Sequence, residues 1–147
     1  MPYKAVVFDL DGTLVESKID YQKMGKQIKE LLGRKGMTEH IEDRRKAYQI
    51  IREGAESLLK FGLPPENLES TLIELDMIMN RIELDALPTM TLKPNAVETI
   101  KALHSKGYRL GICTRSHRVY ADKTLEMYGL DSLFHAVVAR DDTPHPK

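Results

Sequence analysis

The sequence has one cysteine, no tryptophan and no excess of charge of either sign. Cys113 cannot close a disulfide within the chain, and the five histidines are scattered without the spacing of a zinc site. The 22 basic and 22 acidic side chains give a formal net charge of +0, which removes a general electrostatic reason to bind nucleic acid or an anionic membrane. Long apolar runs are missing too, so we expect no membrane span. The single cysteine favours a reducing compartment, the cytoplasm.

The composition is that of a folded protein of modest size. The 147 residues include 41% hydrophobic and 30% charged side chains, with 9 glycines and 7 prolines. Such a chain can bury a core and is not compositionally disordered. Its length suits one compact domain with at most one small inserted module.

Strand and helix patterns alternate near the two ends of the chain. Residues 5–8 form an unbroken β-rich apolar run, typical of a strand buried on both faces of a parallel sheet. Past Pro88 the patterns predict a helix between Pro94 and Gly107, a strand over 108–113, a helix closed by Gly129 and a strand over 136–139. This alternation indicates a parallel sheet with crossover helices.

Three helical patterns fill the middle of the chain. The predicted helices cover residues 20–32, a stretch capped by Thr38 and ending near Gly62, and a stretch opened by Pro64 and Pro65. Tyr21 and Tyr48 lie on the apolar stripes, so we interpret both as core residues. Three helices without strands indicate a separate helical module.

We therefore predict an α/β fold with a doubly wound, Rossmann-like parallel sheet and an inserted α-helical module. The core is expected to comprise residues 1–14 and 89–147, and the insert residues 15–88. Hinges are expected within residues 15–18 and 84–92.

Two carboxylates directly follow the first predicted strand. Asp9 and Asp11 would lie at the carboxyl end of a parallel strand, where open α/β sheets hold their ligands. Gly12 allows the sharp turn that brings backbone close to a bound group. One carboxylate can attack a substrate or bind a metal while the other transfers a proton. The alternative is that these aspartates only organise a turn.

Residues 7–15, Val-Phe-Asp-Leu-Asp-Gly-Thr-Leu-Val, resemble the first motif of the haloacid dehalogenase superfamily of phosphohydrolases. The resemblance implies that Asp9 attacks phosphorus to give an aspartyl-phosphate, and that Asp11 acts as acid and then base. It also implies Mg²⁺ on the Asp9 carboxylate and the Asp11 backbone carbonyl, with Gly12 and Thr13 near the substrate phosphate.

Residues 110–114, Leu-Gly-Ile-Cys-Thr, resemble the second family motif. Thr114 would donate to a phosphoryl oxygen, and the backbone amides of Arg115 and Ser116 would add to the anion site. The alternative for Thr114 is an ordinary helix cap. We interpret Cys113 as a small buried hydrophobe.

The approach to the third motif is Asp-Asp-Thr-Pro-His-Pro-Lys at residues 141–147. The resemblance implies that Lys147 neutralises phosphoryl charge, and the alternative is a terminal lysine without a role. The acidic fourth motif has no counterpart, so we expect a shortened form of a longer phosphatase.

The insert occupies the place of the family's first class of helical caps, which close over the active site and select substrates. Within it, Arg44, Arg45 and Lys46 could bind an anionic group of the substrate, or could simply form a solvated helix face.

The resemblance thus implies a Mg²⁺-dependent phosphomonoesterase of the phosphoglycolate phosphatase and β-phosphoglucomutase branch. Its partner would be a small phosphorylated metabolite such as phosphoglycolate. Arg115 stands where such phosphatases usually place Asn, which leaves the substrate open. The alternatives are a phosphomutase or pyrophosphatase of the same superfamily, and a non-catalytic phosphate-binding module. The oligomeric state is not indicated.

Overall fold

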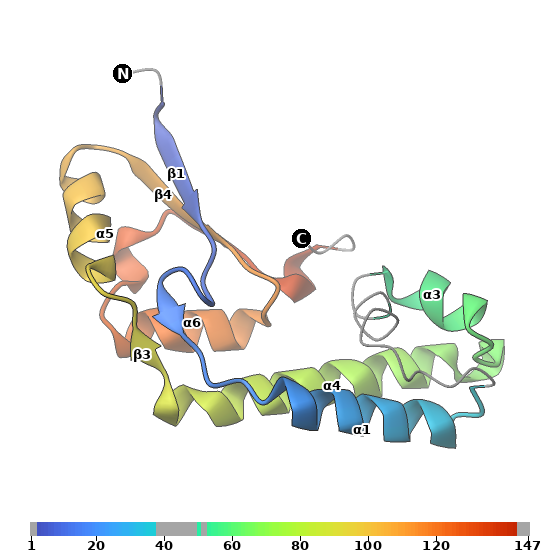
Figure 1. Cartoon of the computed structure of the whole chain (residues 1–147). Coiled ribbons are helices and arrows are strands. Elements are labelled where there is room, and N and C mark those ends of the chain that lie inside the picture. Colours follow the sequence, from blue (N-terminus) through green and yellow to red (C-terminus); the bar gives the residue numbers. More distant parts are fainter. Residues whose placement is uncertain (1–2, 38–49, 51–52, 144–147) are drawn as a thin grey trace. The chain divides into compact units, whose positions relative to one another are not determined.

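The computed structural model describes residues 3–37, 50 and 53–143 (Figure 1). The chain divides into two compact units. The first, here called the core unit, comprises Met1–Ile19 and Glu83–Lys147, and the second, the inserted unit, comprises Asp20–Ile82. The inserted unit lies wholly within the segment that the sequence predicts as an insert.

The core unit is built on a three-stranded parallel sheet. Its strands are β1 (Ala5–Phe8), β4 (Arg109–Cys113) and β5 (Ala136–Val138), in the order β1-β4-β5. Phe8 of β1 pairs with Ile112 of β4, and Ile112 pairs in turn with Val137 of β5. Helix α5 (Ala96–Ser105) precedes β4 and helix α6 (Arg118–Met127) precedes β5. The predicted α/β class and the alternation of helix and strand are confirmed.

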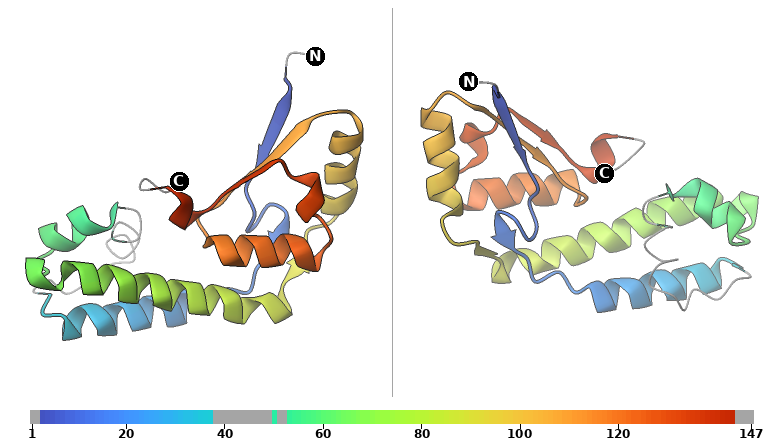
Figure 2. Two further views of the ribbon diagram at one scale, coloured as in Figure 1. Left: turned by 180° about the vertical axis from the view of Figure 1, so that it is seen from behind. Right: turned by 45° about the horizontal axis from the view of Figure 1, so that its top comes forward.

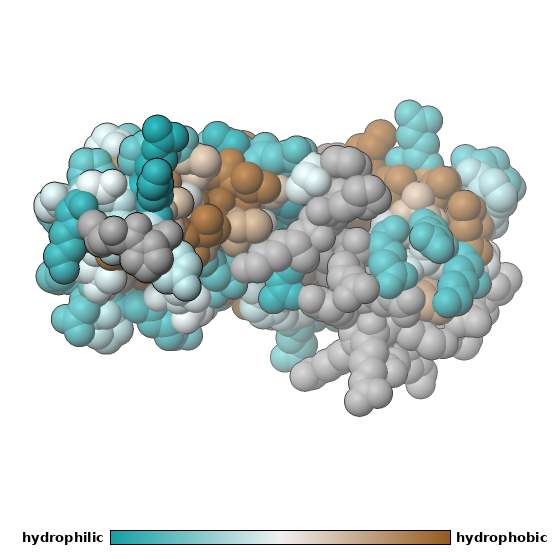
Figure 3. Space-filling view, turned by 90° about the horizontal axis from the view of Figure 1, so that it is seen from above, coloured by the Kyte–Doolittle hydropathy of each residue, from teal (hydrophilic) through white to brown (hydrophobic). Residues whose placement is uncertain are grey.

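The two faces of this sheet differ in burial. On the face that packs against the helices, Leu110 and Ile112 are 1% exposed. On the opposite face Val7 is 66% exposed and Val138 is 42% exposed. Helices α5 and α6 lie on one side of the sheet in Figure 2, as expected for two crossovers of the same hand that advance in the same direction. The doubly wound arrangement predicted from the sequence, with helices on both faces, is therefore not seen in the described part of the core unit. Apolar side chains reach the surface of the core unit in Figure 3.

The burial pattern corrects two expectations. The prediction that residues 5–8 are buried on both faces is wrong, because no described element covers the face that carries Val7. Cys113 is half-buried rather than fully buried. It lies on the same face as Val7, since Val7 pairs with Gly111 and parallel partners point their side chains the same way.

The two connections between the units are paired with each other. Strand β2 (Val15–Glu16) runs antiparallel to β3 (Thr91–Leu92), with Val15 opposite Leu92. Lys93 forms an ion pair with Glu16, and its hydrogen bond and charge lower the pKa of the Glu16 carboxyl. The chain therefore leaves the core unit and returns to it through adjacent segments.

The described helices of the inserted unit are α1 (Tyr21–Arg34), α3 (Ala55–Lys60) and most of α4 (Leu68–Ala86). Helices α1 and α4 lie side by side and antiparallel. Arg81 donates a hydrogen bond to Gln27 at 2.9 Å, and Lys35, which caps α1, forms an ion pair with Glu74 at 2.6 Å. Short 3-10 turns occur at Pro65–Asn67, Leu87–Thr89, Asp131–Leu133 and Arg140–Asp142.

The predicted apolar stripes are buried over most of α1 and, on α4, at Leu75, Met79 and Ile82. Met24, Ile28, Leu31 and Leu32 are buried on α1. The prediction that Tyr21 is a core residue is wrong. Its side chain is 64% exposed at the first position of the helix. Most of the helix predicted between Thr38 and Gly62 lies outside the described residues, as do Tyr48, Arg44, Arg45 and Lys46. None of the described helices combines the length and apolar composition needed to cross a bilayer.

The difference between the sheet faces can be measured by truncation. We expect Ile112→Ala to lower the free energy of unfolding by about 2–5 kcal/mol, because it empties a site in the packed core. Val7→Ala on the exposed face should cost only about 0.5 kcal/mol. Denaturant unfolding followed by circular dichroism would test both. Equal losses would contradict the assignment of the buried face.

Candidate active site

The loop that follows β1 is wound around one carbonyl group. The backbone amides of Thr13, Leu14 and Val15 all donate to the Leu10 oxygen, at 2.9 to 3.3 Å, and the Leu10 side chain is fully buried. Gly12 has a φ of 78°, a conformation that strongly favours glycine. The Leu10 amide donates to Asp9 Oδ1 at 2.9 Å. The loop holds Asp9 and Asp11 at the carboxyl end of the strand, with Gly12 and Thr13 exposed beside them.

Hydroxyl groups donate to both oxygens of the Asp11 carboxylate. Ser116 Oγ donates to Oδ2 at 2.7 Å, and Tyr120 Oη donates to Oδ1 at 2.6 Å. Ser116 precedes α6 and Tyr120 lies in its first turn, so both donors come from one short stretch of chain. Ser116 is 6% exposed and Tyr120 is fully buried. No sequence pattern singled out Tyr120, which is an aromatic residue at ordinary helical spacing.

Thr114 lies immediately after β4, at the same edge of the sheet as Asp9. Its backbone amide donates to Val138 at 2.9 Å, and its side chain is buried. Thr114 Oγ1 accepts a hydrogen bond from the Ser116 amide at 3.1 Å. The Ser116 amide that the sequence analysis assigned to a phosphate thus has an internal acceptor here, and its contact with phosphate stays a prediction. Arg115 is exposed between the two.

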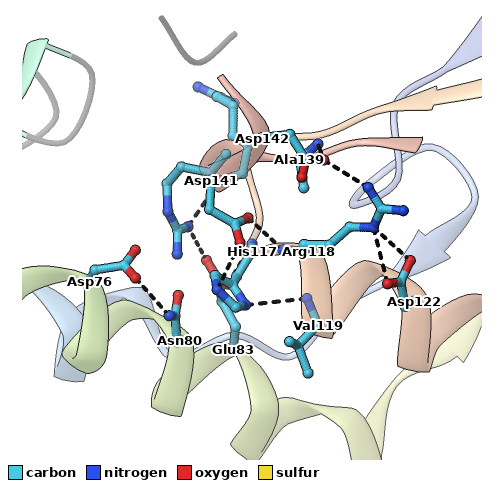
Figure 4. Close-up of polar contacts among 12 residues, drawn as sticks. Asp76, Asn80, Glu83, His117, Arg118, Val119, Asp122, Ala139, Asp141 and Asp142 are labelled. Atoms are coloured by element: carbon cyan, nitrogen blue, oxygen red, sulfur yellow. Dashed lines mark hydrogen bonds and ion pairs between the residues drawn. The ribbon is translucent and has the colours of Figure 1, made fainter. Parts of the chain in front are cut away.

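Carboxylates already occupy the amino-terminal end of α6 (Figure 4). Glu83 Oε2 accepts from the His117 amide at 2.9 Å, and Asp141 Oδ1 accepts from the Arg118 amide at 2.7 Å. His117 Nε2 also lies 3.0 Å from Asp141 Oδ2. These acidic groups satisfy backbone donors that would otherwise be open to an anionic ligand.

Glu83 and Arg140 form a buried ion pair behind the Thr114 loop. Glu83 Oε1 lies 2.6 Å from Arg140 Nη1, and the two side chains are 5% and 8% exposed. Arg140 Nη1 also donates to the Arg115 carbonyl at 3.0 Å. Burial raises the pKa of the Glu83 carboxyl, although Arg140 and the His117 amide oppose the shift. The sequence offers one signal for this pair. Glu83 directly follows Ile82, a residue on the apolar stripe of its helix.

Arg118 and Asp142 join α6 to the segment that follows β5. Arg118 Nη1 donates to Asp142 Oδ2 at 3.0 Å, and its Nε lies 3.0 Å from Asp122. The Ala139 amide and Arg118 lower the pKa of the Asp142 carboxyl. Asp141 and Asp142 are thus engaged with α6.

The described residues offer few ligands for a metal ion. Asp9 supplies carboxylate oxygen, which is the donor type that Mg²⁺ prefers. In the ranges that the structure describes, no three histidine, cysteine, aspartate or glutamate side chains gather as a metal site. Lys147 lies outside these ranges.

Together these observations define an α/β protein whose candidate site lies at the carboxyl edge of a parallel sheet, with paired aspartates after one strand and a threonine after the next. The model of the haloacid dehalogenase-like hydrolases matches residues 3–147. The chain belongs to that family.

The chain is similar to curated phosphatases over most of its length. A phosphoglycolate phosphatase of Cereibacter sphaeroides is 29% identical over 147 residues, which cover 97% of this chain and 65% of that protein. The mitochondrial (DL)-glycerol-3-phosphatase 1 of Arabidopsis thaliana is 31% identical over 140 residues, covering 93% of this chain and 45% of that protein. The chain thus spans less than two thirds of the length of either relative.

The fold is similar to that of solved members of the family. A haloacid dehalogenase-like hydrolase from Bacteroides fragilis matches with a TM-score of 0.62 at 22% identity, over 99% of this chain and 67% of that one. At this identity the likeness concerns the fold alone.

The buried pair allows a double-mutant test. Arg140→Met should lower the free energy of unfolding by roughly 3–5 kcal/mol, because it leaves Glu83 buried without its cation. Glu83→Leu combined with Arg140→Met should recover much of that loss, since no buried charge remains. Denaturant unfolding of the single and double variants measures the coupling. Additive losses would mean that the two side chains do not depend on each other.

The raised pKa of Glu83 predicts a pH dependence of stability. Above the ordinary value of 4.5, the folded chain keeps a proton on Glu83 that the unfolded chain has lost. The contribution of Glu83 to the free energy of unfolding is therefore complete below pH 4.5, and it declines as the pH rises from 4.5 through the raised pKa of the folded chain. In Glu83→Gln this decline should be missing. If the free energies of unfolding of the wild-type chain and of Glu83→Gln changed in parallel with pH above 4.5, the raised pKa of Glu83 would be contradicted.

Proposed function

We propose that this chain carries the catalytic core of a phosphomonoester hydrolase that uses Asp9 as its nucleophile. The main support is the position of Asp9 and Asp11 at the carboxyl end of β1, with the Asp11 carboxylate hydrogen-bonded to groups from the loop and helix that follow β4. Family membership supports the reaction class, and the curated relatives named above are phosphatases of small phosphate esters.

The reaction divides between the two aspartates. Asp9 forms a bond to phosphorus as the ester bond breaks, while Asp11 gives its proton to the departing oxygen. Asp11 then takes a proton from the water that attacks phosphorus, and the bond between Asp9 and phosphorus breaks to release inorganic phosphate. Asp9 must therefore be ionised at the outset, and Asp11 must alternate between its two protonation states.

Phosphate binding is assigned to the loops around these aspartates. Thr114 follows β4 at the same sheet edge as Asp9, and its hydroxyl can donate to a phosphoryl oxygen. The Arg115 amide, the exposed Gly12 and Thr13 backbone and the Lys147 ammonium would supply further donors, while the Ser116 amide would first have to leave Thr114.

Haloacid dehalogenase-like phosphatases generally use Mg²⁺, and the oxygen donors here fit part of such a site. The Asp9 carboxylate and the Asp11 backbone carbonyl would hold the ion, which would neutralise charge on the phosphoryl group. Because the Asp11 side chain is held by Ser116 and Tyr120, Asp9 supplies the main ligand charge. We expect weak binding of Mg²⁺ to this chain, measurable by isothermal titration. Tight binding would mean that ligands outside the described residues complete the site.

We assign a small alkyl phosphate such as phosphoglycolate as the substrate class, following the names of the relatives. The inserted unit has the position in the chain of a helical cap, between the Asp9 loop and the Thr114 strand, and we assign it to substrate selection. Replacing side chains there would then alter the ranking among phosphate esters.

Substitution of the nucleophile tests the proposal. Asp9→Asn should abolish Mg²⁺-dependent hydrolysis of p-nitrophenyl phosphate and phosphoglycolate, because an amide oxygen is too weak a nucleophile to attack phosphorus. Release of inorganic phosphate gives the rate, and circular dichroism checks the fold. Asp131→Asn, an exposed aspartate on the Asp131–Leu133 turn, is the matched control and should keep full activity. Undiminished turnover by Asp9→Asn would overturn the assignment.

A further inference from the structure

We propose that Ser116 and Tyr120 are positioning residues that hold Asp11 in orientation for proton transfer. This inference rests on the proposed function, in which Asp11 is first an acid and then a base. It adds to the family's paired aspartates two residues whose side-chain hydroxyls act through Asp11.

The geometry favours a fixed carboxylate. The contacts to Oδ1 and Oδ2, at 2.6 and 2.7 Å, engage both ends of the group, so rotation about its last side-chain bond would break both. Tyr120 is a fully buried residue of α6, so its ring is fixed by the surrounding core. A buried tyrosine hydroxyl needs a partner, and the Tyr120 hydroxyl donates to the Asp11 carboxylate. The rigid Tyr120 hydroxyl therefore fixes the position of the Asp11 side chain, which lies on a loop.

Hydroxyl donors also suit a group that changes its protonation state. An ionised carboxylate offers about four lone-pair positions, and a protonated one keeps part of that capacity while it gains one donor. Ser116 and Tyr120 can thus stay bonded to Asp11 when it carries the proton on an outward lone pair. A lysine in their place would favour the ionised form strongly and would hinder the acid step.

A leaving-group comparison separates positioning from general damage. An alkyl leaving group needs the proton from Asp11, whereas p-nitrophenolate leaves without one. In Tyr120→Phe, kcat/KM for phosphoglycolate should fall on the order of tenfold, while kcat/KM for p-nitrophenyl phosphate should change less than about threefold. Ser116→Ala should show the same split, and Ser116→Thr, which keeps the hydroxyl, should restore the phosphoglycolate rate.

Tyr128→Phe is the matched control. The Tyr128 hydroxyl donates to the Met90 carbonyl at 3.0 Å, directly after α6 and away from Asp11, so its loss should leave both rates unchanged. The inference is overturned if Tyr120→Phe slows both substrates equally or slows neither. If the unaltered chain hydrolysed neither substrate, this would instead count against the proposed function.

A measurement that needs no turnover separates failure of this inference from failure of the proposed function. With aspartate labelled at the side-chain carbonyl with ¹³C, the Asp11 resonance can be assigned by its absence in Asp11→Asn. At one fixed pH, this resonance should move in Tyr120→Phe and in Ser116→Ala, and should stay in place in Tyr128→Phe. An unmoved Asp11 resonance in the first two variants would overturn the inference even if the chain hydrolyses nothing.

Discussion

The candidate site depends on the parallel pairing of three strands. Because β1, β4 and β5 run in one direction, with Phe8, Ile112 and Val137 at the same level, the chain emerges from all three at a single edge. Segments that are far apart in the sequence then meet within hydrogen-bonding distance. The Arg140 amide donates to the Ser116 carbonyl at 2.9 Å, and Ser116 Oγ reaches Asp11 at 2.7 Å. An antiparallel partner in place of β4 would put its outgoing loop at the opposite edge.

Such an edge concentrates negative charge, and the structure compensates four of its carboxylates locally. Glu83 and Asp141 accept amides at the start of α6, where the helix dipole favours anions. Asp11 has two hydroxyl donors, and Asp142 has Arg118. Since the first amides of α6 already have acceptors, the helix has less capacity to bind a phosphate by itself. The Thr114 hydroxyl and the loop backbone are therefore the stronger candidates for phosphate binding.

Sequence patterns could predict the sheet and the paired aspartates because both arise from local rules. A short β-rich run ending at Asp9, and the apolar run before Thr114, identify strands whose ends carry polar groups. The exposure of Val7 could not be read in this way, because burial of a strand face depends on what packs against it rather than on the strand itself. Tyr21 shows the same limit of periodicity, since its position on a stripe does not reveal that its side chain is 64% exposed.

The contacts to Asp11 were beyond local rules for another reason. Ser116 and Tyr120 lie more than a hundred residues from Asp11 in sequence, and no spacing between them encodes the contact. The register of β1 against β4 brings the two segments together, and that register is set by the packing of the whole sheet. A tyrosine at an ordinary core position gives no sign in the sequence that its hydroxyl meets an acid.

We interpret the buried pair of Glu83 and Arg140 as a source of specificity more than of stability. Removing two charges from water costs several kcal/mol, roughly what their attraction returns, so apolar residues could pack there about as well. Apolar side chains, however, would tolerate several rotations of α4 about its axis. Glu83 is satisfied where its oxygens meet both Arg140 Nη1 and the His117 amide. Arg140 in turn holds the Arg115 carbonyl, so the rotation of the last turns of α4 and the shape of the Thr114 loop are fixed by the same few atoms.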